Sequence, residues 1–141
     1  LRNGPVVGLA AGFVHSVLQL VFGLANVAWV PDMLGKVLCV LFDYIFPFTI
    51  LGLAGMLYGK FNNTNVDFIV GASVVVFLRF CSHFLTGVYI WGQWAPDGMG
   101  KYLYSFLYNG GFLGVDFAIL LVVLVLMLKS EEVKKLIERV K

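Results

Sequence analysis

Residues 79–109 read RFCSHFLTGVYIWGQWAPDGMGKYLYSFLYN, and the sequence on both sides of this stretch is strongly apolar. The stretch combines an arginine, Arg79, and a histidine, His83, with tryptophans, tyrosines and an asparagine. Ionisable side chains at membrane depth are costly, so they are rare unless they face the interior of a helix bundle or a water-filled cavity. The stretch therefore predicts a site for a polar, aromatic small molecule inside a membrane protein.

Composition supports the membrane interpretation. Of the 141 residues, 60% are apolar and 13% are charged, and the mean hydropathy is +0.92. Soluble domains are roughly 45–50% apolar and about 25% charged. The net charge is only +2, and no basic patch alternates with aromatic residues, which argues against nucleic-acid binding. Cys39 and Cys81 lie in apolar runs without metal-ligand spacing, so we expect buried free thiols and neither a metal nor another cofactor.

Hydropathy divides the chain into four candidate membrane spans. A spanning helix needs about 20 mostly apolar residues, and runs of this kind lie at about 5–24, 33–58, 66–91 and 102–128. Glycine, proline, asparagine and aspartate separate the runs. No strand-like alternation persists along them. The sequence therefore predicts an all-α integral membrane protein, with a transmembrane helical bundle over residues 1–128.

The basic residues predict the orientation of the bundle. With four spans, Arg2, Lys60 and the basic residues after position 128 lie on one side of the membrane. Lys36 and Lys101 lie on the other side. Loops with more lysine and arginine tend to face the cytoplasm. We therefore expect both ends of the chain to be cytoplasmic.

Residues 129–141 predict a short amphipathic cytoplasmic helix. Val133, Leu136, Ile137 and Val140 recur at helical spacing and form one apolar stripe. The simpler interpretation is a solvated extension of the last span. The alternative is a docking surface for a cytoplasmic partner.

Polar residues of three spans are predicted to meet in one layer of the bundle. Depth along each helix, counted at about 1.5 Å per residue, places Asp43, His83 and Asn109 in the same half of the membrane. Arg79 and His83 are four residues apart and share a helix face. An acid, an imidazole and an amide with aromatic walls suit a flat heteroaromatic ligand, and Trp91 can stack on a cationic ring.

Each of these residues also has a structural interpretation. Asp43 could be an acid that a neighbouring helix satisfies, and Arg79 and Asp116 could form an ion pair between the last two spans. Trp91 and Tyr104 could anchor the protein at the membrane interface. A structural or assembly subunit is therefore an alternative function. An integral-membrane enzyme is a further alternative, although the sequence contains no nucleophile elbow, HExxH motif or paired carboxylates.

Two motifs resemble those of a known family. RxxxHFxxGxxxWxQ runs from Arg79 to Gln93, and YSxxxNG runs from Tyr104 to Gly110. Together they resemble the thiamine-specific substrate-binding subunit (S component) of bacterial energy-coupling factor (ECF) transporters. A weaker match, an Asp-Tyr pair at Asp43 followed by LGLAG, lies upstream. The resemblance covers about residues 1–128. It implies a six-helix fold of which this chain would be helices three to six.

The resemblance implies a set of substrate-binding residues: Asp43, Tyr44, Arg79, His83, Trp91, Tyr104 and Asn109. In the family pattern, the acid contacts thiamine, and the histidine and tryptophan enclose its rings. The pattern has glutamate where this chain has Asp43, and lysine where it has Arg79. Asp116 has no counterpart in the pattern.

The resemblance also implies the function and the partners. We expect a protein of the bacterial cell membrane that captures thiamine, or a thiamine-like precursor, from outside the cell and does no chemistry on it. The expected partners are a transmembrane coupling subunit and ATPase subunits. No cofactor is implied.

Overall fold

The structure is a computed structural model that describes residues 4–138. Its helical elements are α1 (Gly4–Trp29), α2 (Met33–Cys39), η1 (Val40–Ile45), α3 (Phe46–Thr49), η2 (Ile50–Leu53), α4 (Thr64–Tyr89), η3 (Trp91–Trp94), α5 (Lys101–Lys129) and α6 (Glu131–Glu138). Four helical segments are long and apolar enough to cross a membrane: α1, Met33–Leu53, α4 and α5. The predicted fold class, an all-α membrane bundle, is therefore confirmed.

The second span, Met33–Leu53, changes its helical type along its length. It begins as α-helix, widens to a π-helical turn at η1, and tightens to 3₁₀-helix at η2. Pro47 explains the widening, because a proline ring crowds the carbonyl group four residues earlier, which is that of Asp43. The Phe46 N–H accordingly bonds to the carbonyl of Leu41, five residues back. Residues 54–59 form turns, so the helix ends before the predicted limit of this span.

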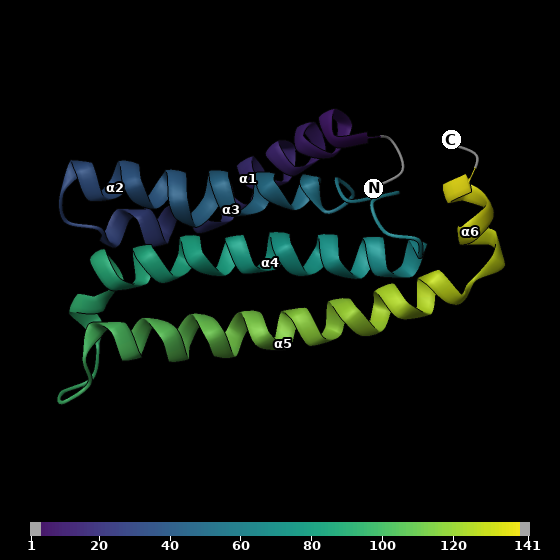
Figure 1. The fold of residues 1–141 in the computed structure, drawn as a ribbon. Coiled ribbons are helices and arrows are strands. Elements are labelled where there is room, and N and C mark those ends of the chain that lie inside the picture. Colours follow the sequence, from purple (N-terminus) through teal and green to yellow (C-terminus); the bar gives the residue numbers. More distant parts are fainter. Residues whose placement is uncertain (1–3, 139–141) are drawn as a thin grey trace.

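In Figure 1, the second span, α4 and α5 run roughly parallel in chain order, and α1 crosses the second span. The second span packs between α1 and α4, and α4 packs along α5. Glycines allow the backbones of neighbouring spans to come into contact. A Cβ atom on Gly8 or on Gly52 would overlap the backbone of the other residue, and a Cβ atom on Gly71 would overlap the Ala54 carbonyl. Small residues serve the same purpose in other membrane bundles, where they let helix backbones touch.

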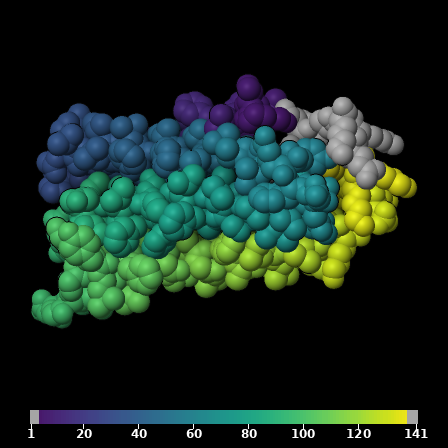
Figure 2. Space-filling model, in the orientation of Figure 1, coloured from purple at the N-terminus to yellow at the C-terminus, as the bar shows by residue number. Residues whose placement is uncertain are grey.

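The outward faces of the edge helices are apolar. Phe22 on α1 and Val115 on α5 are among many large apolar side chains that are exposed in the isolated chain. Such faces suit contact with lipid hydrocarbon. A helix is suited to this environment because its backbone polar groups form hydrogen bonds within the helix. Figure 2 shows the second span, α4 and α5 packed against one another on this face, with α6 at one end.

At the same end, α6 turns back onto the bundle instead of extending α5. Its Ile137 packs against a buried cluster of Phe68, Ala72, Leu124 and Leu128. Val140, the last member of the predicted apolar stripe, lies outside the described residues. The part of the stripe that is described therefore contributes one residue to the packing between α4 and α5.

Candidate functional site

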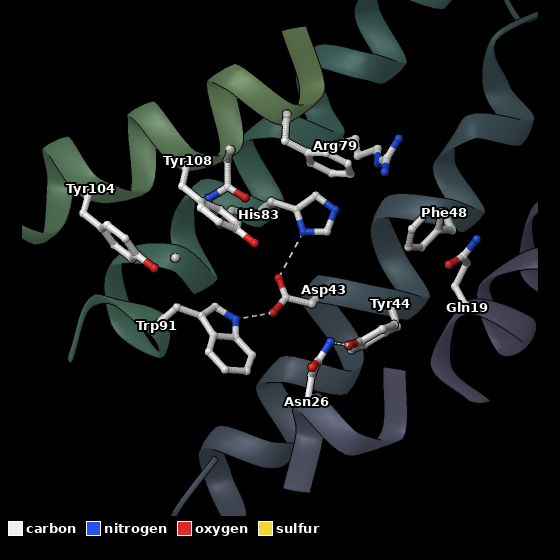
Figure 3. Close-up of a pocket in the computed structure, with 13 residues that line it drawn as sticks. Gln19, Asn26, Asp43, Tyr44, Phe48, Arg79, His83, Trp91, Tyr104 and Tyr108 are labelled. Carbon is white, nitrogen blue, oxygen red and sulfur yellow. Dashed lines mark hydrogen bonds and ion pairs between the residues drawn. The ribbon is translucent and has the colours of Figure 1, made fainter. Parts of the chain in front are cut away.

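A cavity of about 390 Å³ lies between the spans, toward the end where α4 meets η3 (Figure 3). All of the sequence-predicted site residues line it: Asp43, Tyr44, Arg79, His83, Trp91, Tyr104 and Asn109. Its remaining lining residues are Gln19, Asn26, Phe48, Gly87, Tyr108 and Phe112. Every long helical segment thus contributes to the lining. Small-molecule sites in proteins are typically cavities of roughly 300–1,000 Å³, so this volume suits a compact ligand.

The carboxylate of Asp43 is the central acceptor of the site. It accepts hydrogen bonds from Nδ1 of His83 at 3.1 Å and from the indole Nε1 of Trp91 at 2.7 Å. The Thr86 hydroxyl and, at 3.5 Å, the Cys39 thiol also donate to it. A buried charge is tolerated only when it is paired or hydrogen-bonded, and bonds to an ionised acceptor are the stronger kind. Asp43 therefore ties the second span to α4 and η3 and also presents a negative charge at the cavity.

The π-helical turn places Asp43 and Tyr44 in the site. Both lie in η1 and both are buried. The Tyr44 hydroxyl donates to the Gly23 carbonyl at 3.2 Å and accepts from the Asn26 amide at 3.4 Å. A Cβ atom on Gly23 would overlap the Tyr44 ring, so glycine at this position lets the ring lie against α1. Single π-type turns in helices occur frequently at functional sites.

Aromatic rings form the walls at the η3 end of the cavity. The rings of Tyr104 and Tyr108 stack with centroids 6.0 Å apart. Trp91 contacts Trp94 at a centroid distance of 5.4 Å. Its bond to Asp43 fixes the orientation of the indole before any ligand arrives. Flat, oriented aromatic faces are suited to stacking with a flat ligand.

Asn109 joins α5 to α4 directly beside the cavity. Its side-chain amide nitrogen donates to the His83 carbonyl at 3.1 Å and to the Ser105 carbonyl at 3.0 Å. The Ser105 hydroxyl donates to the Phe84 carbonyl at 2.8 Å. The two helices can approach this closely because residue 87 is glycine, and a Cβ atom there would overlap the Ser105 hydroxyl. Asn109 therefore positions the α5 wall of the cavity.

Arg79 lies at the opposite end of the cavity from Trp91 (Figure 3). Its guanidinium group sits over the ring of Phe48 at 4.8 Å and over that of Phe112 at 5.8 Å. Its Nη1 atom is 3.5 Å from a carboxylate oxygen of Asp116. Arg79 therefore both forms an ion pair and lines the cavity.

Two buried polar atoms of the lining residues lack a hydrogen-bond partner within residues 4–138. They are Nε of Arg79 and Nε2 of His83. Leaving a buried polar group unpaired costs about 1–3 kcal/mol. When the imidazole of His83 is neutral and its Nδ1 donates to Asp43, its Nε2 is an acceptor. This part of the site can therefore gain hydrogen bonds from a ligand that carries N–H groups.

Sequence reasoning missed the contribution of α1. Gln19 and Asn26 line the cavity, although neither belongs to the polar layer predicted from the other spans. The sequence held one signal, because Gln19 is an amide inside an apolar run. In the structure, its side chain lies 3.5 Å from the ring of His15. Phe48 and Phe112 left no such signal, because a phenylalanine in an apolar span is indistinguishable from a lipid-facing one.

No group of three or more histidine, cysteine, aspartate or glutamate side chains in the described part of the chain is arranged to hold a metal ion. The four spans found among residues 4–138 define a multi-pass membrane protein, and the cavity between them has the volume of a small-molecule site. Residues 1–136 match the family described as Thiamine transporter protein (Thia_YuaJ). The chain belongs to this family, and the resemblance found in its motifs is confirmed at that level.

Two relatives are similar over much of the chain, and both are named thiamine transporter ThiT. The protein from Lacticaseibacillus paracasei is 28% identical over 121 residues, which cover 79% of this chain and 58% of the relative. The protein from Bacillus subtilis is 29% identical over 135 residues, which cover 89% of this chain and 67% of the relative. The chain thus spans about three-fifths to two-thirds of the length of these relatives.

Proposed function

We propose that this chain forms the ligand-binding cavity of a membrane transporter that captures thiamine, or a close thiamine-like precursor, from outside the cell. One observation supports this most strongly: a single cavity gathers a buried carboxylate, an imidazole and oriented aromatic faces. The family and the names of the relatives supply the identity of the ligand.

The chemistry of thiamine complements these groups. Its thiazolium ring is a permanent cation, which the negative charge of Asp43 attracts, and its flat rings can stack on the aromatic walls of the cavity. Its aminopyrimidine ring carries an exocyclic N–H group, which the unpaired Nε2 of His83 can accept. Tyr104 and Tyr108 offer further stacking surface at the same end of the cavity. In this proposal the bound ligand is not altered chemically.

The proposal extends to coupling and orientation. Capture alone does not move a ligand against its gradient, so we propose a transmembrane coupling subunit and ATPase subunits of the energy-coupling factor type as partners. Both ends of the chain would then be cytoplasmic. Residues 129–141 would form a tail on the partner side of the bacterial cell membrane.

One observation favours a second candidate, a structural role for the polar cluster. The Asp43 carboxylate already accepts bonds from His83, Thr86 and Trp91, so it holds helices together without a ligand. In that case, ligand addition would leave the stability of the protein unchanged. A ligand that binds only the folded state must instead raise its melting temperature.

The test is calorimetric titration of thiamine into the detergent-purified full-length protein, with no ATPase present. We expect Trp91→Ala to weaken binding by about 100-fold, because it removes both a stacking face and a hydrogen bond to Asp43. Trp29→Ala is the matched control, since Trp29 is 72% exposed and lies outside the cavity lining. Equal thiamine affinity in both variants and the parent protein would reject the assignment of the cavity as the binding site.

A further inference from the structure

We propose that Asp116 sets the charge selectivity of the cavity. By pairing with Arg79, it would keep the only lining guanidinium among the described residues neutralised, so that the site accepts a cationic ligand and disfavours a phosphorylated one. This inference rests on the proposed function. It adds a specificity-determining residue that lies outside the cavity lining and outside the family motifs.

Asp116 is the ion-pair partner of Arg79. The two residues lie on neighbouring helices, α5 and α4, and one oxygen of Asp116 is 3.5 Å from Nη1 of Arg79. The Arg79 side chain is 13% exposed, whereas that of Asp116 is 47% exposed. The guanidinium group is held over the rings of Phe48 and Phe112. Asp116 therefore supplies compensating charge from the outer side of a cation whose position is otherwise fixed by aromatic packing.

Some hydrogen-bond donors of Arg79 are not used by Asp116. A guanidinium group has five N–H donors, and the structure pairs it with one carboxylate oxygen while its Nε has no partner within residues 4–138. Arginine presents these donors in a planar fork that matches phosphate oxygens. Without a counter-charge, this end of the cavity would attract a phosphate group.

The charges nearest the cavity favour a cation when Asp116 is included. Asp43 contributes a negative charge, Arg79 a positive one and Asp116 a second negative one. The charges of these three residues sum to one net negative charge, which a single thiazolium cation balances. Neutralising Asp116 brings this sum to zero and leaves Arg79 uncompensated. Coulomb interactions are largest between charges at such short distances.

The positive charge of Arg79 lies at one end of the cavity, so it acts on one end of a bound ligand. Figure 3 places Arg79 and Phe48 at one end of the cavity, and Trp91 and Tyr104 at the other. In this inference, the aminopyrimidine ring of the ligand stacks on the aromatic walls and its hydroxyethyl arm extends toward Arg79. Thiamine monophosphate differs from thiamine only by a phosphate on its hydroxyethyl arm, so the two compounds isolate the effect of this charge.

The test is the ratio of the dissociation constants of thiamine monophosphate and thiamine, measured by calorimetric titration on the full-length protein. We expect Asp116→Asn to lower this ratio by about tenfold or more, because Arg79 becomes free to bind phosphate. The matched control, Asp116→Glu, keeps the charge and should keep the ratio within about threefold. In a double variant with Arg79→Met, the effect of Asp116→Asn should disappear.

The outcomes separate this inference from the proposed function. If Asp116→Asn weakens both ligands equally, or leaves their ratio unchanged, Asp116 is only a structural partner and the inference is overturned. If the parent protein binds thiamine, the proposed function survives that result. If the parent protein binds neither ligand, both the proposed function and this inference fail.

Discussion

The negative charge of Asp43 should account for a large share of thiamine affinity, and Asp43→Asn tests this with almost no change in shape. The carboxylate accepts from His83 at one oxygen and from Trp91 at the other. An asparagine amide has only one oxygen. If the amide oxygen faces away from Trp91, the indole N–H loses its acceptor. If it faces Trp91, the amide NH₂ faces Nδ1 of His83, so the proton of the imidazole must move to Nε2, which then no longer accepts a hydrogen bond from the ligand.

The magnitude follows from two contributions. A hydrogen bond to a charged group contributes about 1.5–3 kcal/mol. The attraction between unit charges about 5 Å apart is about 3 kcal/mol at an effective dielectric constant near 20. The hydrogen bonds to Asp43 are present before the ligand binds, so they affect affinity only by holding the two rings in place. The free ligand also exchanges hydration for the charge interaction, so the two contributions do not add in full. We therefore expect a net loss of about 2–4 kcal/mol, which is about a 30- to 1,000-fold rise in the dissociation constant.

Calorimetric titration of the purified protein measures this loss directly. Asp97→Asn is the matched control, because it removes the same charge from an exposed loop residue. A neutral ligand, the aminopyrimidine half of thiamine, should lose less affinity than thiamine does on Asp43→Asn. A folded Asp43→Asn protein that binds thiamine within about threefold of the parent would refute this reasoning, and equal losses for both ligands would refute the Coulomb contribution.

Two further predictions concern packing around the site. Gly87→Ala should lower stability by about 1–3 kcal/mol and weaken thiamine binding, because the new Cβ atom collides with the Ser105 hydroxyl. Thermal unfolding and titration measure both effects, and an unchanged melting temperature would contradict the close approach of α4 and α5. Asp67→Asn should lower the melting temperature but leave thiamine affinity unchanged, because the buried Asp67 carboxylate accepts from the backbone N–H groups of Gly59 and Phe61 far from the cavity. A loss of affinity at constant stability would show that this loop communicates with the site.

Much of the fold could be predicted from the sequence because the bilayer imposes simple requirements. A span needs a long apolar run, and four such runs are visible. The same constraint makes interior polar residues conspicuous. Asp43, His83 and Asn109 stand out against apolar surroundings, and a depth count brings them together, as they are in the cavity lining.

The local shape of the second span could not be predicted in the same way. Pro47 indicates a disturbance in the helix, but it does not determine whether the helix kinks, breaks or widens. The structure widens the helix into a π-type turn at Val40–Ile45, and this choice depends on what Tyr44 and Asp43 can contact on α1 and α4. Such contacts are tertiary, so no local pattern in the sequence contains them.

The hydrogen-bond partners of Asp43 could not be predicted from sequence patterns either. Trp91 was expected to act as a stacking surface or an interface anchor, and neither interpretation included a hydrogen bond from its indole to Asp43. The bond joins residues that are 48 positions apart. Helical periodicity predicts which face a residue occupies within its own helix, but not which atom of a distant helix it meets.

The structural and ligand-binding interpretations of the polar cluster describe two consequences of one arrangement. A carboxylate buried among helices must be satisfied by donors, and here the donors are side chains that line the cavity, His83 and Trp91. Satisfying the charge therefore also fixes the ring orientations that a flat ligand needs, so little ordering remains to be done at binding. Two lining atoms without a partner within residues 4–138, Nε2 of His83 and Nε of Arg79, belong to residues that a ligand in the cavity could approach. In this arrangement, the bonds that hold the helices together and the geometry proposed for ligand recognition depend on the same acid, Asp43.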